Sequence, residues 1–464
     1  MTELAFMKAA ELAPLIKSKQ LSPVELTTHI VNRIHHIDPT LKAYITPLFD
    51  IALFQAKKAE TDIMQGHYKG ALHGIPVGIK DNYFTKDIRT TVGSKLFATF
   101  IPDKNATVVD KLYAAGAVML GKTNMHELAA GSTGTDPCFG TTRNPWNMGH
   151  MPGGSSGGSS AALAAGLATL ATGTDTFGSI RLPAAMCGIY GMKPTVGLIS
   201  TQGIFPTAWS LDHAGPMARS ISDLAILLQY MAGYDANNPP SVRIPVPDYT
   251  KELHKGIKGI KIAIPTYYLK GLDPDVEKLF NDAIARLQNL GAIIQEIVIP
   301  ELTMSPFAGY ITVTGEASSL HSGWLKTCPG DYSPDIRSFF LAGTLTNTTQ
   351  YIHAQQARRK MVDVLHETFK NVDILLGPTI PITTPAFAEN WVDQNLEVIK
   401  RCLPFTSPAN LSGVPSLSVP MGLDHKGLPV GMQFIGNHFS EKQLLQAGYA
   451  WERVHGGFTE GRRH

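Results

Sequence analysis

The chain has 464 residues, enough for two or three domains or for one large α/β sheet. Hydrophobic residues make up 44% of it and charged residues 17%, a balance typical of a globular protein with a large core. Forty basic and 38 acidic residues leave a net charge of +2, which disfavours nucleic acid or a membrane surface as a partner. Four cysteines without CxxC spacing argue against a disulfide framework and against a zinc site.

The N-terminal segment MTELAFMKAAELAPL carries two glutamates and lacks the basic start and apolar centre of a secretory signal. No apolar run in the chain approaches the roughly 20 residues that span a bilayer. We therefore expect a cytoplasmic protein.

Capping signals and apolar periodicity predict the elements of the N-terminal part. Residues 22–25, Ser-Pro-Val-Glu, form a capping box with proline at the first helical position, which predicts a helix to about Ile37. The pattern further along predicts a helix at 51–64, a short strand at 74–79, a helix at 106–115 and a buried strand at 117–120.

Residues 116–123, GAVMLGKT, match the phosphate-loop pattern GxxxxGK[ST] letter for letter. A phosphate loop connects a strand to a helix and presents backbone N–H groups in a polar turn. Here the four middle residues form the strand, and the helix comes before it. We therefore expect no phosphate site in this segment.

The stretch from Met151 to Pro194 is the most informative in the chain. Residues 152–160 contain only proline, glycine and serine, so the backbone there can approach a ligand or another segment closely. Residues 161–171 are small and apolar, which predicts a tightly packed helix, and 172–181 form a second loop rich in glycine, serine and threonine. A flexible linker would not run into a core helix and another glycine loop. We interpret the stretch as two rigid, serine-bearing loops.

The C-terminal half predicts further α/β structure. An amphipathic helix from Asp273-Pro274 to about Leu290 lies between strands expected at 260–264 and 293–299. This β-α-β unit indicates a largely parallel sheet. The remaining expected elements are a strand at 374–376 and a last helix from Ser440 to about Val454.

Two segments, GGSSGGSSAA at 153–162 and GTDTFGSIRLPAAMCG at 173–188, resemble the signature of the amidase signature family. The segment GIPVGIKD at 74–81 resembles the family's third marker. The resemblance implies the amidase signature fold, an α/β domain over residues 1–464 with a single large mixed β-sheet covered by helices on both faces. Residues 234–350 hold the fewest family-like motifs, so we expect variable substrate loops there. Further family-like stretches lie at 116–127, 140–147, 210–220, 404–422 and 427–436.

The resemblance also implies a serine–serine–lysine catalytic triad. The nucleophile falls on Ser179, the second serine on Ser155 and the base on Lys80, and serine–lysine arrangements need no catalytic histidine. A lysine with a pKa near 10.4 is almost fully protonated at pH 7, but burial favours the neutral amine. A neutral Lys80 can take a proton from Ser155, which takes one from Ser179, because a hydroxyl both donates and accepts. The family further implies a cis peptide bond before Ser155.

The oxyanion hole implied by the resemblance consists of the backbone N–H groups of Thr176, Phe177, Gly178 and Ser179. The family's usual residue at position 177 is glycine. Phenylalanine keeps the N–H group and adds a large ring beside the acyl pocket. We expect the ring to form one wall of that pocket and to limit the acyl group.

Four other polar residues are candidates for supporting the site. Asp175 and Arg181 flank the nucleophile, and we favour a loop-holding ion pair over direct participation in the chemistry. Arg337 and Asn410 are candidates for lining the substrate cleft, although isolated polar residues are more often structural. The resemblance implies no metal and no organic cofactor.

Two other hydrolase patterns can be tested on the sequence. Residues 154–158 match GxSxG, the nucleophile elbow of α/β-hydrolases, with Ser156 as nucleophile. That elbow must follow a strand, and residues 147–152 do not form one. His126-Glu127 lacks the second histidine of an HExxH metal site, because Ala130 stands in its place.

We therefore predict an amidase that hydrolyses a carboxylic amide to an acid and ammonia or an amine through an acyl-enzyme on Ser179. The expected partner is a small-molecule amide, and the sequence does not decide whether the protein forms a homodimer. One alternative is the A-type subunit of a tRNA-dependent amidotransferase, for which tRNA and a second subunit would be the partners. Against it, Leu403 stands where an acidic residue for the amino group of glutamine is expected. A non-catalytic binding homologue is disfavoured because Lys80, Ser155 and Ser179 are all present.

Overall fold

The computed structural model describes residues 2–457, whose strands form one mixed sheet in the order β1-β3-β2-β4-β6-β5-β10-β11-β9-β7-β8. Strand β2 runs parallel to β3 and β4, whereas β4 and β6 are antiparallel. The α/β class and the mixed sheet implied by the resemblance are confirmed. The expectation of a largely parallel sheet is wrong, because six of the ten strand pairings among the described residues are antiparallel. The strands are β1 (Tyr44–Pro47), β2 (Pro76–Lys80), β3 (Val118–Thr123), β4 (Leu170–Asp175), β5 (Tyr190–Lys193), β6 (His213–Ala218), β7 (Lys261–Pro265), β8 (Ile293–Ile297), β9 (Ile374–Pro378), β10 (Ser416–Leu423) and β11 (Pro429–Gly436).

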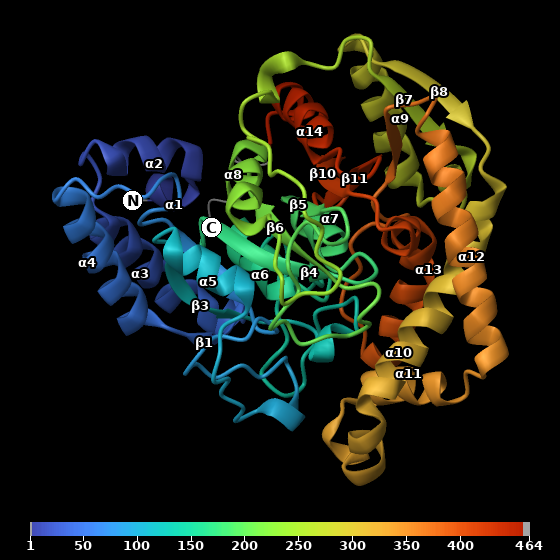
Figure 1. Ribbon diagram of the computed structural model, residues 1–464, viewed down its shortest axis with the longest axis horizontal. Helices are drawn as coiled ribbons and strands as arrows, with labels where there is room; N and C mark the ends of the chain where they lie inside the picture. Colours follow the sequence, from blue (N-terminus) through green and yellow to red (C-terminus); the bar gives the residue numbers. More distant parts are fainter. Residues whose placement is uncertain (1, 458–464) are drawn as a thin grey trace.

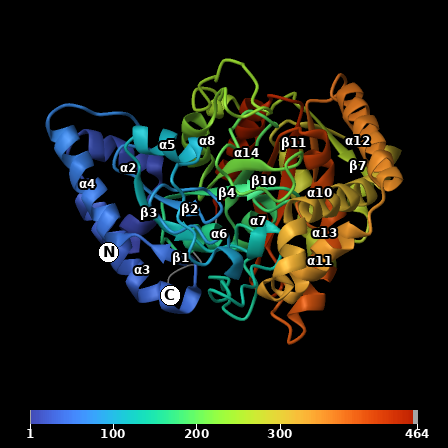
Figure 2. The same ribbon diagram turned by 60° about the horizontal axis from the view of Figure 1, so that its bottom comes forward.

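The helices gather on the faces and flanks of this sheet. Helices α2 to α4 lie on one flank and α10 to α13 on the other, and the two views agree on this (Figures 1 and 2). The helices are α1 (Thr2–Phe6), α2 (Ala9–Lys17), α3 (Pro23–Leu41), α4 (Phe49–Met64), α5 (Thr107–Ala114), α6 (Gly157–Ala164), α7 (Arg181–Cys187), α8 (Ile221–Met231), α9 (Pro274–Asn289), α10 (Ser305–Thr327), α11 (Pro334–Thr344), α12 (Thr348–Thr368), α13 (Trp391–Ser412) and α14 (Glu441–His455).

Neighbouring residues of the central strands show that helices cover both faces of the sheet. Leu417 of β10 pairs with Phe434 of β11 and packs against Gly448 of α14. The next residue along β11, Gln433, accepts a hydrogen bond from Arg181 of α7. Successive side chains of a strand point to opposite faces. Helices α14 and α7 therefore lie on opposite sides of the sheet.

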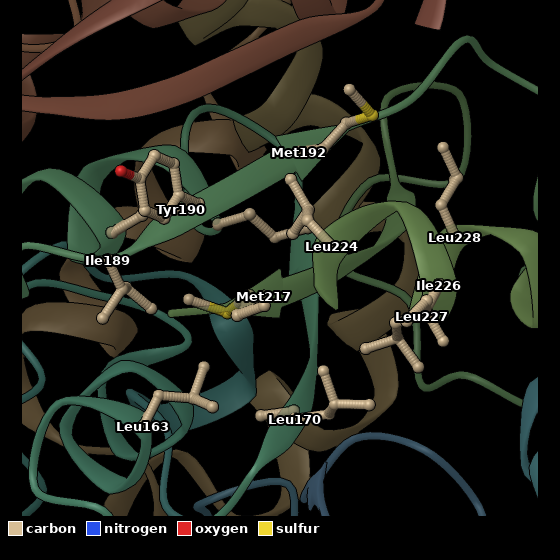
Figure 3. Close-up of a cluster of buried hydrophobic side chains, with 14 of the residues drawn as sticks. Leu163, Leu170, Ile189, Tyr190, Met192, Met217, Leu224, Ile226, Leu227 and Leu228 are labelled. Atoms are coloured by element: carbon tan, nitrogen blue, oxygen red, sulfur yellow. The ribbon is translucent and has the colours of Figure 1, made fainter. Parts of the chain in front are cut away.

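The core beside α8 illustrates how the sheet is stabilised (Figure 3). Leu170 of β4 and Met192 of β5 lie on the face of the sheet that α8 covers, with Leu224 and Leu228 of that helix, and all four side chains are fully buried. Burial of one such side chain contributes about 1.5–3 kcal/mol to the free energy of folding, relative to leaving the side chain exposed. The strands that carry the site are thus fixed from the face opposite to α6 and α7.

Several expected elements are confirmed with shifted ends. Helix α3 begins at Pro23 behind the Ser22 cap, whose hydroxyl accepts from the N–H groups of Val24 and Glu25. It ends at Leu41, four residues beyond the predicted Ile37. The expected β-α-β unit is also present, because β7 and β8 flank α9 and run parallel.

The prediction for residues 161–181 was wrong in its boundaries. The helix begins earlier, at Gly157, and ends at Ala164, and residues 170–175 form strand β4 where the end of a helix and the start of a loop were expected. Small residues carry no period that separates a buried helix from a buried strand. Pairing with β2 and β6 makes residues 170–175 a strand, and this pairing cannot be predicted from the local sequence.

The phosphate-like segment 116–123 is a strand and not a polar turn. Lys122 lies in β3, fully buried, and its Nζ donates to the carbonyl of Tyr83 and to Thr90 Oγ1 at 2.8 and 2.7 Å. Asp81 Oδ1 lies 3.3 Å from the same Nζ. Protein groups therefore occupy the position that a phosphate would need.

The section 234–350, where variable substrate loops are expected, also contains regular structure. It supplies two strands of the sheet, β7 and β8, and helices α9 to α11. Within residues 2–457, no helix combines the length and the apolar character needed to cross a bilayer.

Gly158 in the first turn of α6 lies in direct contact with the neighbouring backbone. A methyl group there would overlap the carbonyl oxygens of Asn124 and Ala43. Gly158→Ala should therefore lower the free energy of unfolding by about 3 kcal/mol, the upper range for overpacking. Urea unfolding measures the loss. Gly157→Ala is the matched control, because its methyl would approach the Pro152 side chain at 3.2 Å and Gly134 Cα at 3.6 Å without overlapping any backbone atom. A loss as large as that of Gly158→Ala would contradict the contact explanation.

Candidate active site

Lys80 ends strand β2 and is fully buried. Its Nζ donates to Ser155 Oγ and to Thr174 Oγ1, both at 2.7 Å, and its backbone N–H donates to Thr172 Oγ1 at 3.0 Å. Strand β4 runs beside β2 in parallel, and Thr172 and Thr174 are two residues apart. Residues spaced by two share a face of a strand, so both hydroxyls reach the lysine.

Burial lowers the pKa of Lys80 to about 7, although the charges of Asp175 and Asp212 act to raise it. At pH 7 a lysine of reference pKa is neutral in only about one molecule in 2,500. The neutral fraction of the buried amine is far larger, because the desolvated site disfavours the charged form. Lys80 is therefore able to accept a proton from Ser155 near neutral pH.

The segment before α6 brings Ser155 to the lysine. Ser155 is fully buried, and the peptide bond between Gly154 and Ser155 is cis, as the resemblance implied. The N–H of Ser156 donates to the carbonyl of Ser179 at 3.1 Å, which joins this segment to the loop after β4. The structure thus brings together Lys80, Ser155 and Ser179, from three separate parts of the sequence.

Ser156, the nucleophile of the alternative GxSxG interpretation, is buried and hydrogen-bonded to the protein backbone. Its side chain is fully buried and its Oγ donates to the carbonyl of Thr174 at 3.3 Å. Residues 147–152, which precede it, form no strand. A nucleophile elbow needs an exposed serine after a strand, so the geometry does not support one here.

The loop that carries Ser179 is held by a buried ion pair. Asp175, at the end of β4, accepts hydrogen bonds from Nε and Nη2 of Arg181 at 3.0 and 3.1 Å, and from the N–H of Gly178 at 2.7 Å. Asn410 Nδ2 adds a fourth hydrogen bond to this carboxylate at 2.8 Å. Burial alone would raise the pKa of Asp175, but Arg181 and Asn410 hold it well below its usual range. The expected loop-holding ion pair is confirmed.

The guanidinium of Arg181 extends the network to two further elements. It donates to the carbonyl of Thr406 at 3.0 Å and to Asn410 Oδ1 at 2.6 Å, both on α13, and to Gln433 Oε1 of β11 at 3.0 Å. All of the surrounding side chains that accept from it are buried. A buried guanidinium that is fully hydrogen-bonded is tolerated, whereas an unpaired one is costly.

The four N–H groups expected in the oxyanion hole differ in their partners. The N–H of Gly178 already donates to Asp175. Among residues 2–457, no protein group accepts from the N–H groups of Thr176, Phe177 or Ser179. Three N–H groups, and not four, are thus free to bind an oxyanion in this structure. Unpaired N–H groups close to a half-buried serine are what acyl-transfer chemistry needs.

A pocket opens directly beside this loop. Its cavity volume is about 40 Å³, so it is a narrow, partly open cleft in this structure. No charged side chain is among the described residues that line it. The lining comes from the loop after β3, from the Ser179 loop, from the loop before β6 and from α10, α11 and α13: Ala129, Ala130, Gly131, Ser132, Thr176, Phe177, Ser179, Thr207, Tyr310, Val313, Phe339, Ile399, Cys402 and Leu403.

Phe177 lines this pocket together with Ser179. The two other residues considered for the cleft lie elsewhere. Asn410 is fully buried and holds Asp175 and Arg181, and Arg337 donates to the carbonyl of Pro329 at 3.4 Å. Neither of them lines the pocket.

Sequence reasoning missed two parts of the site. Thr174, the second acceptor for Lys80, was assigned to a loop, and only a strand makes its alternation with Thr172 visible. The pocket loop 129–132 is tied to α13 by the N–H of Ser132, which donates to Asn395 Oδ1 at 2.9 Å. The run Gly-Ser-Thr-Gly at 131–134 between apolar segments was the one available signal.

Comparison with known proteins agrees with this geometry. Residues 25–445 match the family model described as Amidase. The chain belongs to the amidase signature family. It is therefore a hydrolase of the amidase type. It is 41% identical over 470 residues to the A subunit of the glutamyl-tRNA(Gln) amidotransferase of Geobacter sp. (strain M21), with 96% of each chain covered.

Solved structures of the family are similar throughout the chain. The peptide amidase of Stenotrophomonas maltophilia has 31% identity and a TM-score of 0.83, with 97% of each chain covered. A bacterial aryl acylamidase has 28% identity and a TM-score of 0.87 and covers 97% of this chain and 96% of its own. The A subunit of the glutamyl-tRNA(Gln) amidotransferase of Thermotoga maritima has 34% identity and a TM-score of 0.82, with coverage of 97% and 95%.

Arg181→Met should remove one partner of the buried pair and leave Asp175 uncompensated. Breaking such a pair costs about 3–5 kcal/mol. We expect a loss of this size in the free energy of unfolding, measured by urea titration. Arg359→Met is the control, because Arg359 pairs with Asp363 on the exposed surface of α12, where ion pairs contribute little. Equal effects of the two changes would contradict the role given to the buried pair.

Proposed function

We propose that the protein is a free amidase that hydrolyses carboxylic amides through an acyl-enzyme on Ser179, with Ser155 as proton relay and Lys80 as base. The observation that carries the proposal is the 2.7 Å hydrogen bond between Lys80 and Ser155, whose neighbour Ser156 is hydrogen-bonded to Ser179 at the wall of the pocket. A lysine with a pKa of about 7 is suited to this task, because a general base works best near the operating pH.

The acylation step uses these groups in sequence. Ser179 Oγ attacks the amide carbonyl while its proton passes to Ser155 and the proton of Ser155 passes to the neutral amine of Lys80. The carbonyl oxygen becomes an oxyanion, which accepts from the N–H groups of Thr176, Phe177 and Ser179. The C–N bond then breaks, and Ser155 delivers a proton to the leaving nitrogen while Lys80 returns its own.

The deacylation step reverses the roles. Water loses a proton to the same relay and attacks the ester of Ser179. The tetrahedral oxyanion forms again in the same position, and its collapse releases the acid and returns the proton to Ser179. No group outside the chain is needed for the proton balance.

The names of the relatives favour a second candidate, the A-type subunit of a tRNA-dependent amidotransferase, whose amide donor would be glutamine. Bound glutamine carries an α-ammonium group that needs a carboxylate nearby. Leu403 and Cys402 line the pocket where such a carboxylate is expected, and the described lining holds no acidic side chain. Placing an ammonium group there without a partner is costly. Copurification with tRNA and a second subunit would favour this candidate over the free amidase.

The nucleophile can be tested by substitution and by labelling. Ser179→Ala should abolish hydrolysis of a panel of simple amides, and a fluorophosphonate should modify Ser179, as mass spectrometry can show. Ser155→Ala should lower kcat/KM by about 10²-fold or more, the contribution typical of general acid–base assistance. Labelling of Ser156 with Ser179 unmodified would contradict the assignment.

The base sets the pH dependence of the reaction. Lys80 must be neutral to accept a proton, so kcat/KM should rise with pH and level off above its pKa of about 7. Lys80→Met should lose activity and remove this inflection from the residual profile.

Lys193 provides the matched control for the pH profile. Burial also lowers its pKa to about 7, but its Nζ donates to the carbonyl of Pro194 and lies outside the pocket. Lys193→Met should therefore keep the inflection. Full activity at pH 5 in the Lys80→Met protein would rule out Lys80 as the base.

A further inference from the structure

The Phe177 ring is held between the oxyanion loop and helix α10. The carbonyl of Phe177 accepts from Thr406 Oγ1 of α13 at 2.7 Å, which fixes the backbone. A methyl group built on Gly309 of α10 would lie 3.1 and 3.2 Å from Cζ and Cε1 of the ring. The ring thus rests on a glycine, and a larger residue there would displace it.

Helix α10 presents this glycine and the pocket on the same side. Gly309 and Val313 are four residues apart, so they share a face of the helix, and Val313 and Tyr310 line the pocket with Phe177. Tyr310 in turn packs edge to face against Phe339 of α11, with 5.8 Å between the ring centroids. Three aromatic side chains therefore line one uncharged pocket next to Ser179.

From this arrangement we infer that the Phe177–Gly309 pair makes the enzyme selective for amides of flat, uncharged acyl groups, of which benzoyl is the simplest. The assignment of the pocket to the acyl group rests on the proposed role of Ser179 as nucleophile. Aromatic groups pack favourably against aromatic rings in stacked or edge-to-face geometry. A charged acyl group would lose its hydration in this pocket and find no counter-ion among the described lining residues.

Gly309 acts through Phe177 and is a positioning residue. An alanine at 309 would move the ring by a few tenths of an ångström, away from α10, and so change the shape of the pocket. Phe177 itself sets the shape that the pocket accepts. Its replacement by glycine or leucine removes the flat surface but keeps the backbone N–H that faces the oxyanion.

Sulfonyl fluorides test the inference without requiring turnover. Ser179 Oγ attacks sulfur, the S–F bond breaks, fluoride leaves and the serine proton passes to the relay, so the organic group comes to lie where the acyl group would. Benzenesulfonyl and cyclohexanesulfonyl fluoride differ mainly in flatness, and methanesulfonyl fluoride is the small reference. Mass spectrometry follows the rate of Ser179 modification by each reagent. Comparing the ratios of these rates between variants cancels the intrinsic reactivity of the reagents.

We expect the benzene-to-cyclohexane ratio to fall by roughly 10- to 100-fold in Phe177→Gly and in Phe177→Leu, the range such pockets discriminate. Gly309→Ala should lower the benzene-to-methane ratio by about tenfold. The matched control is Gly323→Ala, also in α10, where an added methyl meets no atom within 4 Å, and its ratios should equal those of the native protein.

The outcomes separate the inference from the proposed function. Modification of Ser179 with ratios that are unchanged in Phe177→Gly, Phe177→Leu and Gly309→Ala overturns the inference and leaves the proposed nucleophile intact. No modification of Ser179 by any of the three reagents overturns the proposed function itself. Faster hydrolysis of glutamine than of benzamide by the native protein also contradicts the inference.

Discussion

The buried ion pair between Asp175 and Arg181 is the interaction on which the geometry of the site depends. It joins the end of β4 to the start of α7, and through Asn410 and Gln433 it reaches α13 and β11. Because both charges are removed from water, the pair is tolerated only when every partner is in place. The loop between the two residues is therefore fixed, and with it the direction of the N–H groups beside Ser179.

The same pair also influences the lysine. Asp175 and Asp212 both act to hold Lys80 in its charged form, and burial acts against them. The charge of Asp175 is largely balanced by Arg181, and burial raises the pKa of Asp212 to about 6, so neither carboxylate overcomes the desolvation of the amine. The resulting pKa of about 7 suits the role of base that we propose for Lys80.

The site is built from two structurally distinct parts. The proposed hydrolytic groups come from β2, β4 and the loops beside them, whereas much of the apolar pocket wall comes from α10, α11 and α13 on the flank of the sheet (Figure 1). Substitutions in these helices can therefore change which substrate group the pocket accepts without disturbing the sheet. Relatives with names as different as peptide amidase, aryl acylamidase and glutamyl-tRNA(Gln) amidotransferase are consistent with such a division.

The sequence by itself determined the family, the α/β class and the three residues that the structure brings together, because specific motifs at 74–81, 153–162 and 173–188 carry them. It also determined the start of α3, since a serine cap and a proline act locally. Only the tertiary structure decided that residues 170–175 are a strand, because small residues fit a helix or a strand and pairing with β2 and β6 selects between them. That strand places Thr174 on Lys80 and directs the Asp175 carboxylate to the N–H of Gly178, which leaves three N–H groups beside Ser179. The contact of Phe177 with Gly309 joins residues 132 positions apart, and no local pattern in a chain encodes such a contact.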